Sequence, residues 1–498
     1  MNFINLNNHQ SIPVSAIPVL DYNVFFETNI SLIQNSPERH CVQYFGYREN
    51  SSLRLFCCIA DDNEHNIRVS SSIVSIADDL SSLTAKNLCF EKFEREIHEN
   101  FGLNYVDHPW LKPVRYPENR SDKSSVIANY PFFHLDSEEL HEVGVGPVHA
   151  GIIEPGHFRF VCNGEQILHL EIQLGYQHRG VERLFLDKTK LIQRTILAES
   201  IAGDSVVGHT SAFAFLMESL SGINAEHDIQ LSRTLAQELE RIAIHTGDLS
   251  AICTDVAYQL GSSVFGRLRT PVINFFQEWC GNRLAKGLIR TGFNPYPLNK
   301  KLVDRLLTIL NAFEPDFIEM NSELSKLPSS LSRFERTGML AYEQLLSIGT
   351  VGMSARMNAL IRDIRLSHPY GLYNEFKHEP IIKHHGDVYS RVQIRKQEVL
   401  QSISYIRQLL NQFSQPQPQP QRIVLKPDSF GISLTEGWRG EICHACITDN
   451  NGEMLVYKIK DPSFHNWLAL ALAVRNNEIS DFPVSNKSFD LSYCGHDL

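Results

Sequence analysis

Apolar residues recur through the middle of the chain at steps of three and four residues, or multiples of these steps. This is the period of a buried or half-buried helix. The clearest run extends from Leu231 to Leu260, and similar patterns cover residues 301–317 and 388–410. Together these segments predict a helix bundle at the centre of the chain.

The first hundred residues mix short strand patterns with helical ones. Residues 53–60 form a β-type apolar run, and residues 93–100 have a helical pattern. The polar segment 117–125 then interrupts both patterns with proline, asparagine, serine and alternating charges, which is typical of a linker. We therefore expect an α+β domain at residues 1–116 and a linker at residues 117–140.

A hairpin and a terminal β piece flank the helical centre. Residues 158–162 and 167–174 are extended apolar-polar runs on either side of Asn163-Gly164, a strong hairpin signal. Strand patterns return at residues 441–447 and 453–459, and an apolar helix and a tail follow them. The predicted fold class is multidomain α+β: an N-terminal α+β domain, a β-hairpin leading into a large helix bundle, and a C-terminal small β piece and helix.

Composition narrows the classes of function and the compartment. The chain has 46 Lys and Arg against 57 Asp and Glu, an acidic balance that argues against a dedicated nucleic-acid binder. Its 10 cysteines are mostly isolated, as expected of reduced cytosolic thiols. The N-terminus lacks the pattern of a secretory signal. The apolar run at residues 467–474 is far shorter than the roughly 20 residues that cross a bilayer. We expect a cytoplasmic protein that reaches a membrane only through partners.

Several common catalytic motifs do not occur. The chain has no GxxxxGK[ST] loop, and the glycines of residues 144–147 do not complete a dinucleotide fingerprint, so we do not expect this chain alone to hold ATP or NAD. It has neither HExxH nor GxSxG. Cys443 and Cys446 form a CxxC without a second ligand pair for zinc, and in a strand they point to opposite faces. Ordinary buried thiols are the expected interpretation.

Four stretches resemble the motifs of one family. Phe93-Glu94-Arg95-Glu96, with Phe101-Gly102 and His108-Pro109 after it, resembles a signature of the smaller of two hydrophilic subunits of respiratory complex I. Residues 146–160 with 174–182, residues 238–248, and residues 363–370 with 386–391 resemble the quinone-site subunit of respiratory complex I and the large subunits of membrane-bound energy-converting [NiFe] hydrogenases. The fused arrangement resembles the large subunits of formate-hydrogenlyase and hydrogenase-4 component G type. Residues 141–498 would be the large-subunit domain.

This resemblance implies an oxidoreductase subunit that acts within a complex. Its partners would be an iron-sulfur small subunit with a [4Fe-4S] cluster and integral membrane antiporter-like subunits. The complex would lie on the cytoplasmic side of the inner membrane, pass electrons to a quinone-like acceptor, and couple this transfer to ion translocation. The alternative is a non-catalytic structural scaffold derived from a hydrogenase large subunit.

The positions of the hydrogenase metal ligands differ in this chain. Family hydrogenases hold nickel and iron through two CxxC pairs, because such redox-active metals need thiolates. The resemblance places the first pair at Ala202 and Ser205 and the second at Ser492 and Gly495, with Cys494 one residue out of register. We therefore expect no [NiFe] centre and no metal ligand in this chain, and active hydrogen chemistry is not expected.

A quinone is the remaining candidate ligand. The resemblance matches His149 to a quinone-binding histidine and places the partner tyrosine at about Gly203, so His209 or His157 would have to replace that donor. His149 could donate to a quinone carbonyl or only bond to the backbone. Glu154 and His157 could form an acid-base relay or a solvated turn.

Two further pairs complete the set. Asp204 and His209 are five residues apart and would lie on different helix faces unless the helix is broken at Gly203. His178 and Arg179 resemble an ion-pair scaffold that faces the iron-sulfur subunit, where a positive charge raises the reduction potential of a cluster. The candidate catalytic residues are His149, Glu154, His157, Asp204 and His209, and the candidate cofactor-binding residues are His149, His178, Arg179, Ala202 and Gly203.

Overall fold

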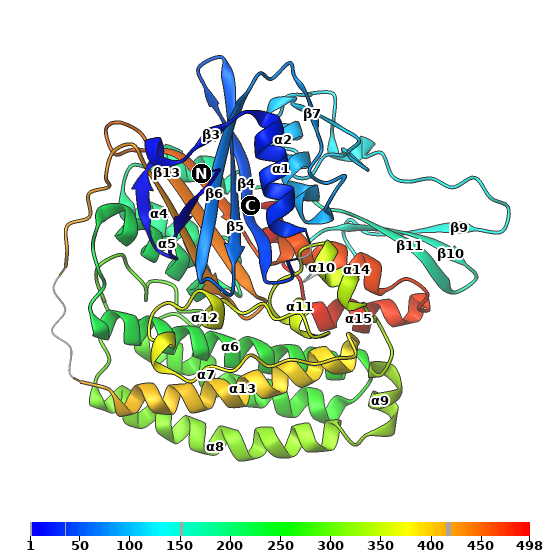
Figure 1. Ribbon diagram of the computed structural model, residues 1–498. Helices are drawn as coiled ribbons and strands as arrows, with labels where there is room; N and C mark the ends of the chain where they lie inside the picture. The colour runs from blue at the N-terminus through cyan, green and yellow to red at the C-terminus, as the bar shows by residue number, and fades with distance from the viewer. Residues whose placement is uncertain (1, 35, 150–152, 415–419) are drawn as a thin grey trace.

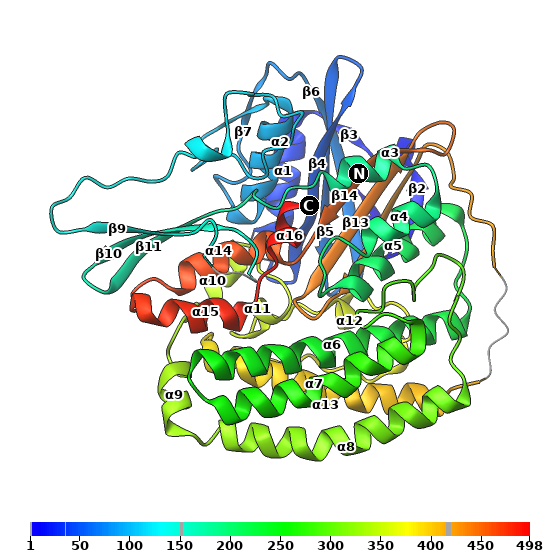
Figure 2. The same cartoon turned by 180° about the vertical axis from the view of Figure 1, so that it is seen from behind.

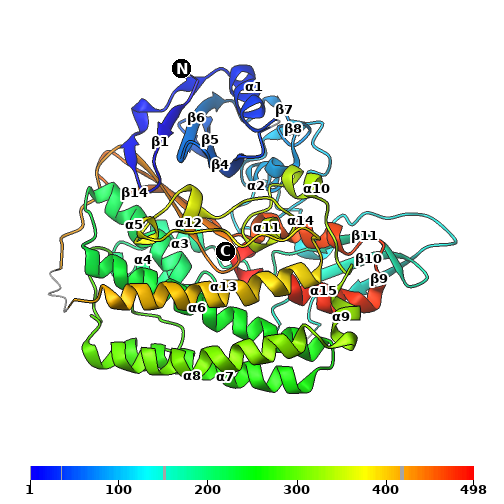
Figure 3. The ribbon, with the colours of Figure 1, turned by 60° about the horizontal axis from the view of Figure 1, so that its bottom comes forward.

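The computed structural model describes residues 2–34, 36–149, 153–414 and 420–498 (Figure 1). Long helices form one side of the molecule, and the sheets lie on the other side (Figures 1 and 3). These helices are α6 (His227–Asp255), α7 (Gln259–Cys280), α8 (Lys300–Leu324) and α13 (Val388–Asn411). Helix α6 packs on both α7 and α13, and α8 packs on the same two helices. The predicted multidomain α+β fold is confirmed.

The N-terminal unit is built on one sheet with the strand order β1-β6-β5-β4, in which β3 also pairs with β6. Its strands are β1 (Ile4–Leu6), β3 (Val19–Leu20), β4 (Arg39–Glu49), β5 (Ser52–Asp61) and β6 (Asn66–Val74). Helices α1 (Tyr22–Ile33) and α2 (Glu91–Phe101) pack beside it, and β7 (Asp79–Ser81) pairs with β8 (Asn104–Val106). The strand predicted at 53–60 and the helix predicted at 93–100 are confirmed.

A three-stranded antiparallel arm projects from the molecule (Figure 2). It contains β9 (His141–Val145), β10 (His157–Asn163) and β11 (Gln166–Gln173). The predicted hairpin is confirmed: Asn163 pairs with Gln166, and Gly164 has a φ of 57°, the left-handed conformation that favours glycine in such turns. The third strand, β9, has no counterpart among the predicted elements.

The second large sheet has the order β14-β13-β12-β2. Strands β12 (Ser429–Glu436), β13 (Glu441–Thr448) and β14 (Met454–Lys460) come from the C-terminal part of the chain, and β2 (Ser11–Pro13) comes from its beginning. Every residue of β12 and β13 is buried, because α5 (Val206–Ser221) covers one face and β4 lies against β13 and β14. The strands predicted at 441–447 and 453–459 are confirmed. Cys443 and Cys446 are buried free thiols in different core clusters, as expected.

The long helical pattern from Leu231 to Leu260 belongs to two helices, so the prediction of one continuous helix is wrong. Helix α6 ends at Asp255, Ala257 has a φ of 58°, and α7 begins at Gln259. The backbone N–H of Tyr258 donates to the carbonyl of Cys253 across this break at 2.7 Å. Because both helices bury their apolar sides in the same core, the hydrophobic period continues through the turn.

The C-terminal tail is more helical than its sequence predicts. Helix α14 (Ser463–Ala473) is the predicted apolar helix, and α15 (Phe482–Phe489) and α16 (Tyr493–Asp497) follow it. The other helices are α3 (Val181–Asp187), α4 (Leu191–Ala198), α9 (Pro328–Phe334), α10 (Tyr342–Ser347), α11 (Met353–Arg356) and α12 (Ile364–Ser367). The proline-rich loop predicted at residues 415–421 lies mostly outside the described residues. None of the described helices has both the length and the apolar character needed to span a bilayer.

Candidate functional site

Most of the predicted site residues meet where three segments converge: the end of β9 with the following loop, the turn before α5, and the C-terminal tail. The backbone N–H of Cys494 donates to the Glu154 carboxylate at 3.0 Å. The His149 ring lies 6.4 Å from the Tyr493 ring. Arg179 donates to the carbonyl of Ser200 at 2.6 Å and to that of Cys494 at 3.3 Å. The tail therefore closes the site between the arm and the α5 turn.

A carboxylate on α6 holds the start of α5 in place. Glu240 accepts hydrogen bonds from the backbone N–H groups of Val207 at 2.7 Å and Gly208 at 3.2 Å, which have no partner inside the first helical turn. A Cβ on Gly208 would lie 2.7 Å from a methyl group of Ile442, so β13 approaches this turn closely. Burial raises the pKa of Glu240 to about 8, and the two backbone donors only partly offset this effect.

Asp204 pairs with Arg439 and not with His209. The two guanidinium nitrogens of Arg439 donate to the two carboxylate oxygens of Asp204 at 2.7 and 2.6 Å. The guanidinium also lies over the Trp438 ring, and its Nε donates to the Asp490 carbonyl at 2.5 Å. Asp204 precedes α5 because the helix begins only at Val206. Such a bidentate, stacked arginine is held in one orientation.

His209 belongs to a separate chain of buried polar groups. Its Nε2 is 3.0 Å from the Asp461 carboxylate, and its Nδ1 is 3.1 Å from Nε2 of His444. The Nδ1 of His444 is in turn 2.8 Å from the Tyr457 hydroxyl. With both rings neutral, Tyr457 donates to His444, His444 donates to His209 and His209 donates to Asp461. We call these four residues the buried relay.

The surroundings of the buried relay favour this arrangement of protons. Burial acts to raise the pKa of Asp461, but the hydrogen bond from His209 and the charge of Arg439 outweigh it, so the pKa is lowered. Burial and the neighbouring His209 ring hold the pKa of His444 well below its usual range. A Cβ on Gly495 would lie 2.7 Å from the Asp461 carboxyl carbon, so the tail packs directly on one end of the buried relay.

His149 and Gly203 border the site on its open side. The His149 ring packs edge-on against Phe158 at a centroid distance of 5.6 Å, and its Nδ1 lies 3.4 Å from the Pro147 carbonyl. Gly203 is exposed, and a Cβ built there would meet no atom within 4 Å. Ala202 behind it is buried, and its carbonyl accepts a hydrogen bond from the N–H of Ser205 at 3.1 Å. Space is therefore present beside Gly203.

His157 is turned away from this group. Its ring packs against Phe132 at 5.1 Å and lies over Gly144, where a Cβ would be 3.3 Å from Cε1 of the histidine. Burial lowers the pKa of His157. The structure gives His157 no contact with Glu154, whose carboxylate is bound by the tail instead.

His178 and Arg179 attach the end of the chain to the arm. The Nδ1 of His178 donates to the Asp497 carbonyl at 2.8 Å, and burial lowers the pKa of this histidine. Arg179 binds backbone carbonyls, including that of Ile201 at 2.8 Å. Glu182 pairs with Lys458 at 2.6 Å. The scaffold predicted around His178 and Arg179 is therefore built mainly from backbone carbonyls.

A buried ionic network connects the site to the helix bundle. Arg439 lies 3.9 Å from the Asp490 carboxylate, and burial together with Asp490 raises the pKa of the adjacent Asp248 to about 8. Asp248 pairs with Arg395 at 3.0 Å. In this network the protonated Asp248 carboxyl donates to Asp490, whose pKa is lowered mainly by Lys487 and Arg439 against the effect of burial.

Glu398 on α13 is the centre of the deeper part of this network. Its carboxylate lies 2.6 Å from Arg356 and 2.7 Å from His245, and all three side chains are fully buried. Arg365 pairs with Asp363 at 2.7 Å. The network also contains Glu238, Arg241, His378 and Glu436. Arg391 lies apart from it and donates to the carbonyls of Gly338 and Gly386, both at 3.1 Å.

Sequence reasoning did not identify several residues of the site. Arg439, Asp461, His444 and Tyr457 come from the second large sheet and the turns at its ends, more than 200 positions after the α5 turn. They belong to no motif, and only the fold brings them beside the α5 turn. Among the residues that the structure describes, no three His, Cys, Asp or Glu side chains converge as the ligands of a metal ion.

Comparisons with known proteins agree with this architecture. The family model described as "Respiratory-chain NADH dehydrogenase, 49 Kd subunit" matches residues 261–430. The hydrogenase-4 component G of Escherichia coli (strain K12) is 26% identical over 80% of this chain and 72% of its own length. The carbon monoxide-induced hydrogenase of Rhodospirillum rubrum is 27% identical over 70% of this chain and 97% of its own length.

A fused protein of the NADH-quinone oxidoreductase type is also similar. The fused NADH-quinone oxidoreductase protein of Phocaeicola vulgatus is 24% identical over 74% of this chain and 76% of its own length. These matches confirm the resemblance drawn from the sequence motifs. The chain is a homologue of the large subunits of hydrogenase-4-type and NADH-quinone oxidoreductase-type complexes.

Proposed function

We propose that this chain is the electron-accepting large subunit of a membrane-associated redox complex. It takes electrons from a [4Fe-4S] cluster in an iron-sulfur small subunit and passes them to a quinone-like acceptor beside Gly203. The relatives support the general part of this proposal, because their names describe hydrogenase and NADH-quinone oxidoreductase proteins. The observation that carries the specific part is the open space at Gly203 next to His149 and the fixed Asp204–Arg439 pair.

The side chains at the positions that the resemblance assigns to metal ligands argue for an organic acceptor. Ala202 offers a methyl group and Gly495 offers no side chain. The Ser492 hydroxyl accepts a hydrogen bond from the N–H of Gly495 at 2.9 Å and begins α16. Burial raises the pKa of the nearby Cys494 to about 11, so this group is a neutral thiol. This donor set does not fit nickel and iron, which need several thiolates.

The residues beside this space could serve reduction of a quinone to a quinol, which consumes two electrons and two protons. His149 would donate a hydrogen bond to one carbonyl oxygen of the acceptor. The buried relay would supply a proton toward Asp461 and the tail, because its hydrogen bonds run in that direction. The positive Arg439 would stabilise negative charge that develops in the space beside Asp204.

The buried ionic network offers a route for coupling to partner subunits in the membrane. A change of charge beside Asp204 acts on Arg439, then on Asp490 and Asp248, and finally on Arg395 in the helix bundle. Such charges interact strongly because water is excluded around them. Ion translocation by antiporter-like partners is therefore part of this proposal.

A non-catalytic scaffold is the second candidate function. The close packing of the tail favours it: a Cβ on Gly156 would lie 2.6 Å from the Tyr493 ring, and Gly495 lies directly on Asp461. In this case the tail only locks the arm to the sheet, and no acceptor enters beside Gly203.

The rate of quinone reduction distinguishes the two functions. The complex is purified with its iron-sulfur partner, reduced chemically, and mixed with a short-chain quinone. We expect His149→Ala to lower the rate by about tenfold, since a well-placed proton donor contributes at least this much, while the exposed His385→Ala leaves it unchanged. An equal rate in the wild type and His149→Ala refutes the role of His149. Absence of any quinone reduction supports the scaffold.

A further inference from the structure

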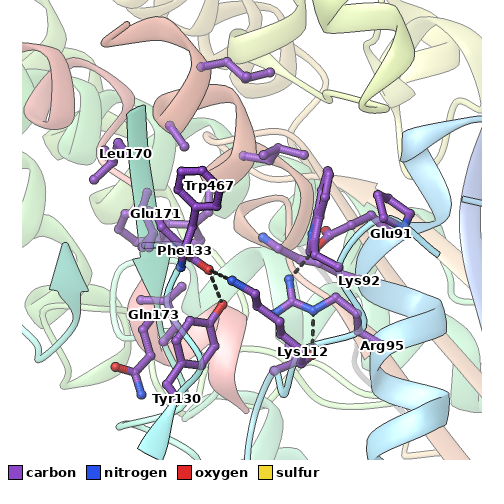
Figure 4. Close-up of a pocket in the computed structure, with 18 of the residues that line it drawn as sticks. Glu91, Lys92, Arg95, Lys112, Tyr130, Phe133, Leu170, Glu171, Gln173 and Trp467 are labelled. Carbon is purple, nitrogen blue, oxygen red and sulfur yellow. Dashed lines mark hydrogen bonds and ion pairs between the residues drawn. The ribbon is translucent and has the colours of Figure 1, made fainter. Parts of the chain in front are cut away.

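A second cavity lies outside the site described above. It has a volume of about 460 Å³ and is enclosed by α2, the segment after β8, strand β11 and helix α14 (Figure 4). This volume is in the range of small-molecule sites in proteins, about 300–1,000 Å³. Its walls come from both the N-terminal unit and the C-terminal part of the chain, so it forms only in the folded full-length protein.

The walls of this cavity are largely apolar. Trp110, Leu170, Trp467 and Leu472 line it together with several prolines and aliphatic residues. Trp467 projects toward the cavity from α14 (Figure 4). Such a surface favours an apolar chain or ring over a sugar or a nucleotide.

The two acidic side chains of the lining are already neutralised. Glu91 pairs with Arg95 and accepts a hydrogen bond from the Trp110 indole at 2.6 Å. Glu171 pairs with Lys112 and accepts a hydrogen bond from the Tyr130 hydroxyl at 3.1 Å (Figure 4). Both carboxylates are therefore occupied by protein groups.

Two other basic side chains of the lining lack a carboxylate. Within the described parts of the chain, neither Lys92 nor Arg475 forms an ion pair. Lys92 donates only to the Phe464 carbonyl at 2.6 Å, and Arg475 contacts His169 at 3.2 Å. Burial lowers the pKa of Lys92 to about 7. A buried ammonium without a counter-charge is costly, so an anion in the cavity would stabilise it.

A buried histidine without a second partner also faces the cavity. His496 lines the cavity and is 2% exposed. Its Nδ1 is 2.8 Å from the Asp497 carboxylate, whereas its Nε2 is buried and has no hydrogen-bond partner among the described residues. The charge of Lys92 is close enough to help hold the pKa of His496 well below its usual range, after the larger effect of burial. Lys92 and His496 therefore lie near each other at one end of the cavity.

We propose that this cavity binds a monoanionic amphiphile, a carboxylate carried on an apolar chain. The carboxylate accepts a hydrogen bond from Lys92 and contacts Nε2 of His496, whose second protonation the anion favours. The apolar chain lies along Trp110 and Trp467. This inference concerns a binding site distinct from the proposed acceptor site, and it holds whether or not the chain reduces a quinone.

Calorimetric titration with dodecanoate tests this proposal on the full-length chain. We expect saturable binding with one site per chain, and about tenfold weaker binding by Lys92→Gln, because a hydrogen bond to a charged group contributes about 1.5–3 kcal/mol. The control Lys301→Gln, at a half-buried position on the outer side of α8, should bind as the wild type does. The cationic dodecyltrimethylammonium should not bind.

A second variant separates binding from folding. Leu468→Trp adds volume to a half-buried lining residue of α14 and should abolish dodecanoate binding while the unfolding temperature stays within a few degrees. Absence of dodecanoate binding by the wild type, or equal binding by the wild type and Lys92→Gln, overturns the proposal. Binding by the isolated chain that disappears in the assembled complex also overturns it and assigns the cavity to a segment of a partner protein.

Discussion

Removal of one carboxylate from the deeper ionic network should destabilise the chain strongly. Glu398 is fully buried between the guanidinium groups of Arg356 and Arg365 and the ring of His245, at 2.6, 3.3 and 2.7 Å. Burial alone would raise its pKa, but these positive neighbours hold the pKa well below its usual range. The substitution Glu398→Gln keeps the volume and removes the charge.

The expected magnitude follows from the charges left behind. Breaking a buried ion pair by removing one partner costs about 3–5 kcal/mol, because the remaining charge stays buried without compensation. At about 2 °C per kcal/mol for a large domain, the unfolding temperature should fall by about 6–10 °C. The control Glu319→Gln, at an exposed position of α8, should change it by less than about 2 °C, since surface changes are worth about 0.5 kcal/mol or less.

Differential scanning calorimetry at pH 7 measures both variants. Because the folded pKa of Glu398 is depressed, its stabilising effect is present above the unfolded pKa and is lost as the pH falls through the folded value. The difference between the wild type and Glu398→Gln should therefore shrink at strongly acidic pH. If Glu398→Gln unfolds at the same temperature as Glu319→Gln, the network does not stabilise the fold as argued.

Two further predictions concern single carboxyl groups of the site. Burial raises the pKa of Glu240 to about 8, so the folded state favours the protonated acid. Its stabilising effect is present below the unfolded pKa and is lost as the pH rises to about 8. Glu240→Gln should therefore flatten the fall of the unfolding temperature between about pH 5 and pH 9, and an unchanged slope contradicts this. Asp461→Asn places an amide opposite His209, disrupts the buried relay, and should slow quinone reduction by the complex about tenfold or more. Reduction of the iron-sulfur partner should proceed at the wild-type rate, and an unchanged quinone rate excludes the buried relay from proton supply.

Local patterns predicted much of the fold. The Asn163-Gly164 turn and its alternating flanks fix the register of the hairpin, because a two-residue turn of this kind leaves few alternatives. The amphipathic period likewise located α8 and α13. The break between α6 and α7 was missed because Ala257 carries no turn signal, although it adopts a left-handed conformation.

The candidate site was predicted less completely for a related reason. The motifs identified His149, Asp204 and His209 but not their partners. Asp204 binds Arg439, and His209 binds Asp461, because strands β13 and β14 pass beside the α5 turn. Contacts between residues so distant in sequence depend on how the sheets pack, and no local spacing reports them. The boundaries proposed at residues 116 and 140 remain predictions.

The nickel content of the purified complex tests the central claim most directly. The account holds that the space between the α5 turn and the C-terminal tail takes an organic acceptor, because Ala202, Ser205, Ser492 and Gly495 supply no thiolate. Elemental analysis should then find nickel far below one atom per chain, in a preparation that reduces a quinone. One tightly held nickel atom per chain would contradict the account.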